Sequence, residues 1–442
     1  MKNKYILHLI FANILWGLIP VLVKDLFKEL SILTVIFLRF FISGIILFFL
    51  AILLIYMNNK NLEMESAKIS LKRLLKFAFQ RNEAFYNIKY IYHFIIIGFL
   101  GIILQIIFFF LALKTTSIAF TMTGFPLSII LIAFYEHGVK TEKLDLFKAL
   151  YLIILTFTII IILFVYIENP EMIPKGGSIV ILKGIIYIVS FALCLMFLQI
   201  AMNKESYSES EIKFMNINRN YKIIRMIIEL SFVFLIGTAL MFPFLLMANY
   251  IPLLEDLTSE TNQFFSELYS FYLYLANWEV LFLIIFSTII PYILIFIASV
   301  KWSPYNLTYG QWSGILTLIE PIGGILFGVI IIKEYFPPLY LLIVLFLLII
   351  SILLRYTHES RNIVNASILI THEKGFLKDL PLKLLKLDGV QSIESLIGIH
   401  DLKLNVRMNS IKDFYLLTNK LRDYNEIKEI KIIFIEDINK LL

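Results

Sequence analysis

The sequence predicts an all-α polytopic membrane protein with ten transmembrane helices, followed by a C-terminal α+β domain. Two observations support this prediction. Ten apolar runs between Tyr5 and about Arg355 are each long enough to cross a bilayer, which takes about 20 largely apolar residues. Beyond Arg355 the pattern changes to short strands and helices. The composition agrees, because 60% of the 442 residues are hydrophobic and only 16% are charged, unlike an average soluble protein.

The first apolar run is expected to remain in the protein as a helix. It extends from Tyr5 to Val23, which is too long for a signal-peptide core, and no small-residue cleavage site follows it. In chain order, the expected spans are 5–24, 31–56, 91–113, 117–135, 147–167, 178–202, 222–249, 278–300, 306–332 and 337–355.

Lysine and arginine residues set the expected orientation, because they gather in cytoplasmic loops. With the N-terminus inside, the inner segments are rich in Lys and Arg, whereas loop 250–277 on the outside carries acidic residues and neither of them. We therefore expect a multi-pass protein of the cell membrane with both termini in the cytoplasm. The basic segment 68–89 is interpreted as an amphipathic helix near anionic membrane lipid, not as a nucleic-acid site.

Several classes of site lack their sequence signals. The single cysteine, Cys194, lies within a span, and the six histidines show no ligand spacing, so we expect no metal site. The chain contains no Gly-x4-Gly-Lys-Ser/Thr phosphate loop and no nucleophile–base arrangement. We therefore expect neither an ATP-driven pump nor an enzyme, and no cofactor.

A loop rich in Pro and Gly, from Glu168 to Ser178, divides the spans five and five. Because five is odd, a duplicated second half would cross the membrane in the opposite sense, which is the inverted-repeat plan of many transporters. We therefore expect two inverted five-helix repeats, over residues 1–168 and 178–356, and a separate domain over residues 363–442.

Short motifs in both halves carry a family resemblance. They are the segments Ala12–Gly17, Phe37–Phe40 and Ala112–Lys114, and the pair Glu320–Pro321 followed by Glu334. In their order and spacing, about residues 5–355 resemble the drug/metabolite transporter superfamily, in particular its EamA-type ten-helix members. The resemblance implies a membrane transporter built from two five-helix repeats.

Glu320 is the leading candidate for substrate binding in the membrane. A carboxylate at mid-bilayer costs at least about 2.5 kcal/mol on insertion scales, so it normally faces a cavity or a partner. Pro321 beside it removes a backbone donor and can bend the helix. A structural ion pair with a basic residue of the bundle is the alternative. Two pairs of small residues are expected to permit close helix contact, Gly310/Gly314 and Gly324/Gly328.

Other polar and aromatic side chains of the spans are further candidates for substrate binding. Each has a structural alternative, because polar residues often bridge helices and aromatic residues often anchor helix ends. Arg39 is interpreted as structural or snorkelling, Lys183 and Arg225 as snorkelling anchors, and Glu334 as a helix cap in preference to a gate. The further candidates are Asn13, Trp16, Gln105, Thr121, Thr123, Tyr309, Gln311 and Trp312.

The C-terminal segment from Ala366 reads strand, helix, strand, strand, helix, strand, which is the ferredoxin-like (βαββαβ) order. Residues Leu402–Met408 alternate apolar and polar side chains, as a half-buried strand does. The helix that follows begins with a capping-box pattern from Ser410. Its core face is expected to hold Ile411, Phe414, Leu417 and Leu421.

A second resemblance covers this domain. The segment Ile397–Val406, preceded by Gly389–Val390, is similar to the effector-binding (RAM) domain of the AsnC/Lrp regulators and contains its Gly-x-x-Asp turn. The resemblance implies an amino-acid effector site with Gly398, His400 and Asp401, and a homodimer. A tight β-turn would use the same residue types for structure alone.

The sequence therefore favours a secondary transporter that moves a small organic metabolite by alternating access, with an amino acid as the leading substrate and effector. A membrane-bound amino-acid sensor without transport is one alternative. Another is a nucleotide-sugar or sugar-phosphate carrier, which would need several basic residues for phosphate. The sequence offers few inside the spans besides Arg39, Lys183 and Arg225.

Overall fold

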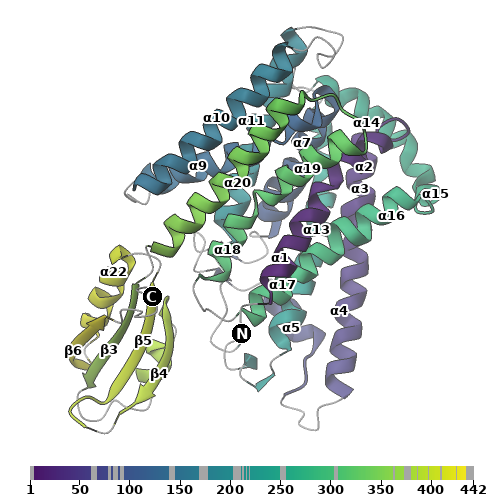
Figure 1. The fold of residues 1–442 in the computed structure, drawn as a ribbon. Helices are drawn as coiled ribbons and strands as arrows, with labels where there is room; N and C mark the ends of the chain where they lie inside the picture. Colours follow the sequence, from purple (N-terminus) through teal and green to yellow (C-terminus); the bar gives the residue numbers. More distant parts are fainter. Residues whose placement is uncertain are drawn as a thin grey trace. The chain divides into compact units, whose positions relative to one another are not determined.

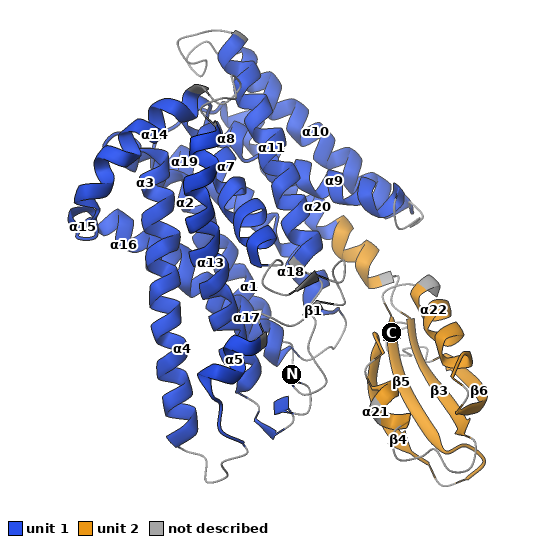
Figure 2. Cartoon of the chain, turned by 180° about the vertical axis from the view of Figure 1, so that it is seen from behind, with its two compact units in different colours: residues 1–353 blue, residues 354–442 orange. Residues whose placement is uncertain are grey.

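The computed structural model divides the chain into two compact units, Met1–Leu353 and Leu354–Leu442, called here the membrane unit and the C-terminal unit (Figure 2). Glu142, which like Glu334 was expected to cap a helix in preference to forming a gate, lies outside the described residues, as does the Pro/Gly-rich stretch 169–177. The structure describes residues 4–60, 67–77, 81–82, 88–89, 94–138, 145–168, 178–202, 211, 214–215, 217–218, 220–248, 255–302, 307–361, 364–372, 380–385, 387–396, 398–408, 411–424 and 426–434.

The membrane unit contains ten helices long and apolar enough to cross a membrane among its described residues, which confirms the predicted number (Figure 1). Several spans are built from consecutive helical pieces, and the pieces η1, η3 and η6 are π-helical. Spans 1 to 5 consist of α1 (Ile6–Gly17) and α2 (Ile19–Leu26); α3 (Ile32–Phe37), η1 (Leu38–Ile42) and α4 (Ser43–Lys60); η3 (Ile96–Leu104) and α7 (Gln105–Thr115); α8 (Ile118–Thr121) and α9 (Gly124–Gly138); and α10 (Leu146–Glu168). Spans 6 to 10 consist of α11 (Ser178–Met202); α13 (Tyr221–Ala248); α16 (Trp278–Ile284), η6 (Ile285–Ile289) and α17 (Ile290–Lys301); α18 (Tyr309–Leu316) and α19 (Ile319–Ile330); and α20 (Pro338–Arg361).

Glycines allow some spans to touch through their backbones. A Cβ at Gly98 of span 3 would lie 2.4 Å from the carbonyl oxygen of Val233, and a Cβ at Gly237 would lie 2.4 Å from that of Gly98. Spans 3 and 7 therefore meet without side chains between them. Close contact is also confirmed at Gly324 and Gly328, which face side chains of span 4. The prediction fails at Gly310, whose Cβ position has open space around it.

Two connections differ from the sequence prediction. Segment 68–89 does not form one amphipathic helix: its described part holds α5 (Leu71–Phe77) and the strands β1 (Arg81–Asn82) and β2 (Ile88–Lys89). These strands pair antiparallel with each other, where the helix was expected to continue. The long acidic loop after span 7 contains α14 (Glu255–Glu267), η5 (Leu268–Ser270) and α15 (Phe271–Tyr274). α14 lies at the end of the membrane unit opposite the N-terminus (Figure 1). We call this the α14 end.

The last span continues past its predicted end. The expected tenth span ends at residue 355, but α20 remains helical to Arg361. No glycine follows Pro338 in this helix and no further proline interrupts it, so the sequence provides no stop signal before Arg361.

The C-terminal unit has the predicted order of elements: β3 (Val364–His372), α21 (Leu380–Leu384), β4 (Val390–Ser395), β5 (Leu402–Met408), α22 (Ile411–Arg422) and β6 (Ile427–Phe434). The strands form one antiparallel sheet in the order β4-β5-β3-β6. In the central register, Ile368 of β3 pairs with Leu404 on one side and Ile432 on the other.

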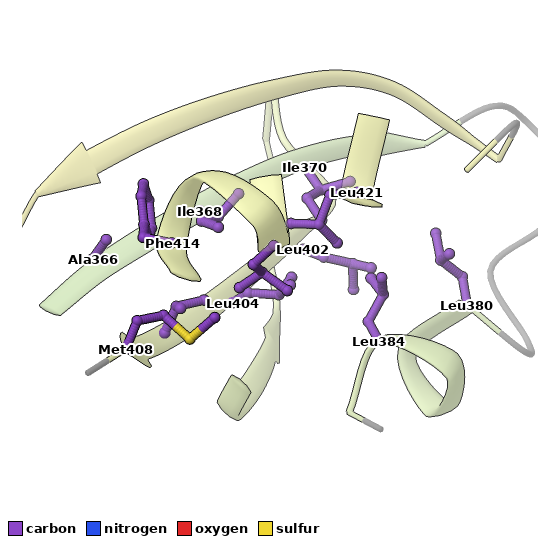
Figure 3. Packing of buried hydrophobic residues seen from close by; sticks show 12 residues of the cluster. Ala366, Ile368, Ile370, Leu380, Leu384, Leu402, Leu404, Met408, Phe414 and Leu421 are labelled. Carbon is purple, nitrogen blue, oxygen red and sulfur yellow. The ribbon is translucent and has the colours of Figure 1, made fainter. Parts of the chain in front are cut away.

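One face of this sheet carries the core of the C-terminal unit. Every second residue of β5, from Leu402 to Met408, is buried, as the alternation predicted. Phe414, Leu417 and Leu421 of α22 pack against these side chains, and Leu380 and Leu384 of α21 complete the core (Figure 3). The side chain of Ile411, expected on the same face, lies outside the described residues.

Candidate functional site

Spans 1, 8 and 9 meet closely in the membrane unit. A Cβ at Gly17 of α1 would lie 3.0 Å from the backbone oxygen of Glu320 in α19, so these helices pack with almost no side chain between them. The neighbouring Trp16 makes an edge-to-face contact with Tyr292 of α17, with ring centroids 5.4 Å apart. Trp16 and Glu320, predicted from their types alone, therefore lie on helices that the fold holds in direct contact.

Arg39 comes from span 2 and is only 3% exposed. Its Nε donates a hydrogen bond to Thr288 Oγ1 at 2.8 Å, and its Nη2 donates one to the backbone oxygen of Ser287 at 3.1 Å. Arg39 lies in η1 and both acceptors lie in η6, so two π-helical segments face each other across this contact. Thr288 Oγ1 in turn donates to the backbone oxygen of Leu283 at 2.8 Å. Short π-helical segments occur frequently at functional sites.

Arg39, Tyr292 and Glu320 lie within electrostatic range of one another. Arg39 Nη1 is buried without a hydrogen-bond partner. Within the described part of the chain, the Glu320 carboxylate and the Tyr292 hydroxyl also make no hydrogen bond, and both side chains keep some accessible surface. Buried polar groups in proteins are normally satisfied. The buried Arg39 Nη1, beside a carboxylate and a phenol that no described residue bonds, makes this place a candidate site for a polar ligand. We call Trp16, Arg39, Tyr292 and Glu320 the central site.

The other predicted candidates in the spans make local bonds or pack in other clusters. Asn13 Nδ2 donates to the backbone oxygen of Leu9 at 2.8 Å, and Thr123 Oγ1 donates to that of Phe120 at 2.6 Å. Thr121 bonds to Ser117 and Thr116, and Gln311 forms a capping box with Thr308. Tyr309 and Trp312 pack around Leu9 and Leu316, and Gln105 is buried at the start of α7. The structure thus groups only Trp16 and Glu320 of these candidates in the central site.

Sequence reasoning missed Tyr292 and set Arg39 aside. Snorkelling is wrong for Arg39, because its guanidinium is enclosed and bonded to span 8. The sequence does contain a signal for this contact. The polar pair Ser287–Thr288 lies inside an apolar run, and Tyr292 follows one helical turn later. A buried arginine needs acceptors, and this pair offers them.

Comparison with known proteins finds a family match in the first half of the membrane unit. Residues 3–164 match the EamA-like transporter family. The match covers spans 1 to 4 and most of span 5, and it supports a membrane transporter. No curated protein gives a significant match. A solved structure entitled "Crystal structure of protein" is 13% identical, with a TM-score of 0.45, and the alignment covers 82% of this chain and 99% of that one.

At the α14 end, Glu334 joins three elements. Its carboxylate accepts from Lys24 Nζ at 2.8 Å and from the backbone N–H of Ile118 at 3.0 Å, at the start of α8. A carboxylate at a helix N-terminus is favourable because it satisfies free N–H groups and opposes the helix dipole. The expectation that Glu334 caps a helix is confirmed. The ion pair with Lys24 also links span 1 to the segment between spans 9 and 10.

Two glutamates of α14 hold the start of span 2 at the same end. Glu260 accepts from the backbone N–H of Ile32 at 2.7 Å and pairs with Lys114 of span 3. Glu267 accepts from the backbone N–H and the hydroxyl of Ser31, and from the hydroxyl of Thr34. In the sequence, this acidic segment indicated only which side of the membrane the loop faces. In the structure, two of its glutamates are bonded to the N-terminus of α3.

The snorkelling interpretation is wrong for Arg225 and Lys183. Arg225 is buried and forms ion pairs with Glu211 at 2.8 Å and Glu229 at 3.3 Å. Lys183 pairs with Asp256 of α14 at 2.9 Å. Both cations are neutralised by carboxylates, which sequence spacing alone did not reveal.

In the C-terminal unit, the predicted effector residues form a turn beside β3. Asp401 accepts from the backbone N–H of His372 at 2.9 Å and pairs with its Nδ1 at 2.7 Å. These contacts, the backbone hydrogen bond first, hold the pKa of Asp401 below its usual value. His400 Nδ1 lies 3.0 Å from Thr371 Oγ1, and Gly398 adopts φ +155°, a conformation that favours glycine. The structure brings the three predicted residues together, with Asp401 engaged by the protein itself.

Proposed function

We propose that this EamA-like protein is a secondary transporter that moves a small organic metabolite, an amino acid, across the cell membrane by alternating access. The observation that supports this most is the central site. It combines a carboxylate, a phenol and a guanidinium that the described protein leaves partly unbonded, deep among spans 1, 2, 8 and 9. Ionisable groups at such depth mark substrate or ion pathways in membrane proteins.

The helix breaks support an inverted-repeat arrangement. Span 4 is divided at Met122–Thr123 and span 9 at Thr317–Leu318, and these are the fourth helix of each proposed repeat. The third helices, spans 3 and 8, both contain a π-helical segment. Interrupted helices in corresponding positions of two halves point to the binding region of a transporter.

The α14 end fits a closed gate in this proposal. If the N-terminus is cytoplasmic, as the lysine and arginine distribution predicts, the α14 end faces outward. Lys24–Glu334 and Lys114–Glu260 then hold the outer ends of spans 1 and 3 to segments of the second half. Opening toward the outside would have to break these ion pairs.

The C-terminal unit is proposed to sense an amino-acid effector and to favour a homodimer. Its strand order β4-β5-β3-β6, with a helix after the first and third strands, supports the proposal of a ferredoxin-like, RAM-like domain. A nucleotide-sugar carrier is disfavoured, because Lys183 and Arg225 are both paired with carboxylates.

Flux measurements in proteoliposomes test the transport proposal. The purified full-length chain should accumulate or release at least one radiolabelled amino acid, and Glu320→Gln should abolish the flux, because the carboxylate is lost while the shape is kept. Asp25→Asn, which removes an exposed carboxylate paired with Lys28, should retain it. Absence of flux for every amino acid tested would contradict the proposal and favour a sensor.

A further inference from the structure

The buried guanidinium of Arg39 has one donor group that the protein does not use. Nε and Nη2 are held by Thr288 and Ser287, whereas Nη1 is enclosed and has no partner. An unmatched buried donor, above all a charged one, is expensive. The two bonds to η6 fix the guanidinium plane, so Nη1 is held in a set direction before any ligand arrives.

The groups near Arg39 define the chemistry of a ligand. Glu320 and Tyr292 are within electrostatic range of the guanidinium, yet within the described residues the Glu320 carboxylate forms no ion pair with it. A direct contact would have satisfied both charges. Because they remain apart, a ligand with its own negative and positive groups can meet both.

The walls of the central site are aromatic. Tyr292 makes edge-to-face contacts with Trp16 and with Phe234, at centroid distances of 5.4 and 5.5 Å, and lies 6.4 Å from Phe296. Apolar rings beside a charge lower the local dielectric and so strengthen its contacts with an opposite charge. A free acid would leave Glu320 unpaired, and a free amine would leave Arg39 unpaired.

We propose that Arg39 Nη1 binds the carboxylate of a zwitterionic amino acid whose ammonium group is bound by Glu320. This inference deepens the proposed transport function and takes its substrate class from it. Tyr292, within range of both charged residues, offers its hydroxyl to either end of the zwitterion. Thr288 acts through Arg39 and is a positioning residue.

Ligand binding to the purified full-length chain tests this assignment separately from transport. The probes are single amino acids, each compared with the amine that lacks its carboxylate and with the acid that lacks its amino group. For the unmodified chain, the amino acid should bind more tightly than either analogue. Arg39→Gln should weaken amino-acid binding by roughly ten- to a hundredfold, the value of a charged hydrogen bond, and leave binding of the amine unchanged.

Glu320→Gln should show the converse, with weaker binding of the amino acid and unchanged binding of the acid. Arg39→Lys keeps the positive charge, so it serves as a second variant in case Arg39→Gln does not fold. It should still bind about tenfold more weakly, because an ammonium lacks the fixed fork of the guanidinium. Lys28→Gln, at an exposed ion pair, is the matched control and should bind as the unmodified chain does. Binding that persists unchanged in Arg39→Gln is assigned to another place, such as the C-terminal unit.

The outcomes separate the two proposals. Arg39-dependent binding without flux would support this site and contradict transport. Flux that is insensitive to Arg39→Gln and Arg39→Lys, or an amine that binds as well as its amino acid, would overturn the site and leave transport standing. Absence of any amino-acid binding overturns the assignment.

Discussion

At the scale of single residues, Arg39 and Arg225, which are both buried in the membrane unit, have different surroundings. Arg225 is enclosed with two carboxylates at ion-pair distance, which offsets the cost of burying its charge. Arg39 is enclosed as well, but its hydrogen bonds go to a hydroxyl and a backbone oxygen, and the nearby carboxylate of Glu320 stays free of direct contact. Arg225 is therefore structural, whereas Arg39 retains the capacity to bind an anion.

Removal of the Thr288 hydroxyl should change substrate affinity without changing any charge. Thr288→Val removes the acceptor of Arg39 Nε and frees the guanidinium to turn. We expect the KM for the transported amino acid to rise about tenfold, with a smaller effect on kcat, because ground-state binding is lost. Initial rates in proteoliposomes measure both constants.

Thr158→Val is the control, since Thr158 is also buried in a span but bonds only to the backbone oxygen of Ile154 at 2.9 Å in the described chain. Equal KM changes in both variants would show that the effect of Thr288 is one of general packing.

At the scale of elements, the α14 end is fixed by carboxylates at helix starts. Glu334 holds the start of α8, and Glu260 and Glu267 hold the start of α3. Glu334 and Glu260 also form ion pairs with Lys24 of span 1 and Lys114 of span 3. A change of state at this end would therefore expose helix N-terminal amides and break ion pairs in the same step.

Loss of the Glu334 charge should open the start of span 4. In Glu334→Gln, the ion pair with Lys24 is lost and the amides of Ile118 and Ala119 lose a charged acceptor. We expect their hydrogen exchange to accelerate about tenfold or more, because a charged hydrogen bond is worth about 1.5–3 kcal/mol. Hydrogen–deuterium exchange with mass spectrometry would resolve this segment. Asp25→Asn, at an exposed ion pair with Lys28, should leave the exchange unchanged; acceleration in both variants would argue against a specific lock.

The elements also show what the sequence could predict and what it could not. Ten spans are recoverable because apolar length alone determines which segments can cross a bilayer. The alternation of apolar and polar residues in Leu402–Met408 correctly predicted a strand, because successive side chains of a strand point to opposite faces of the sheet. The π-helical segments η1 and η6 leave no hydropathy signal, since they change hydrogen-bond spacing and not composition. The hydrogen-bond acceptors of Arg39 could not be predicted, because they lie on a span distant in the sequence.

At the scale of the whole molecule, the proposal joins a transport site in one unit to an effector site in the other. Effector binding can shift the transporter between states only if its affinity differs between them. Thermodynamic reciprocity then requires the transported substrate to change the effector affinity of the C-terminal unit by the same factor. α20 belongs to both units, since it runs from Pro338 in the membrane unit to Arg361 in the C-terminal unit.

A variant of the effector turn should therefore change transport without touching the membrane unit. In Asp401→Asn, the charged contact with His372 is lost. If the turn Gly398–Asp401 binds an effector, the effector should no longer stimulate or inhibit flux in Asp401→Asn. Flux without effector should be unchanged. Flux assays with and without each amino acid on the side of the C-terminal unit measure this.

Glu426→Gln, which removes a carboxylate paired with Lys383 in the same unit, is the control and should keep the effector response. An unchanged response in Asp401→Asn would assign the turn a structural role only. Folding of Asp401→Asn can be checked near neutral pH. The pKa of Asp401 is lowered in the folded chain, so its contribution to stability is present at neutral pH and is lost only as pH falls through that lowered value.

The π-helical segment η1 also limits which insertions and deletions span 2 can accept. An i→i+5 turn holds an extra residue relative to an α turn, so deleting one residue within η1 can restore an α turn and keep the faces of α4. A one-residue deletion in the first turn of α4 has no such slack and would rotate the rest of the helix by about 100°. Phe48 and Ile52 would then take the buried positions of Leu47 and Ala51. A deletion within η1 should therefore be tolerated better than one in the first turn of α4.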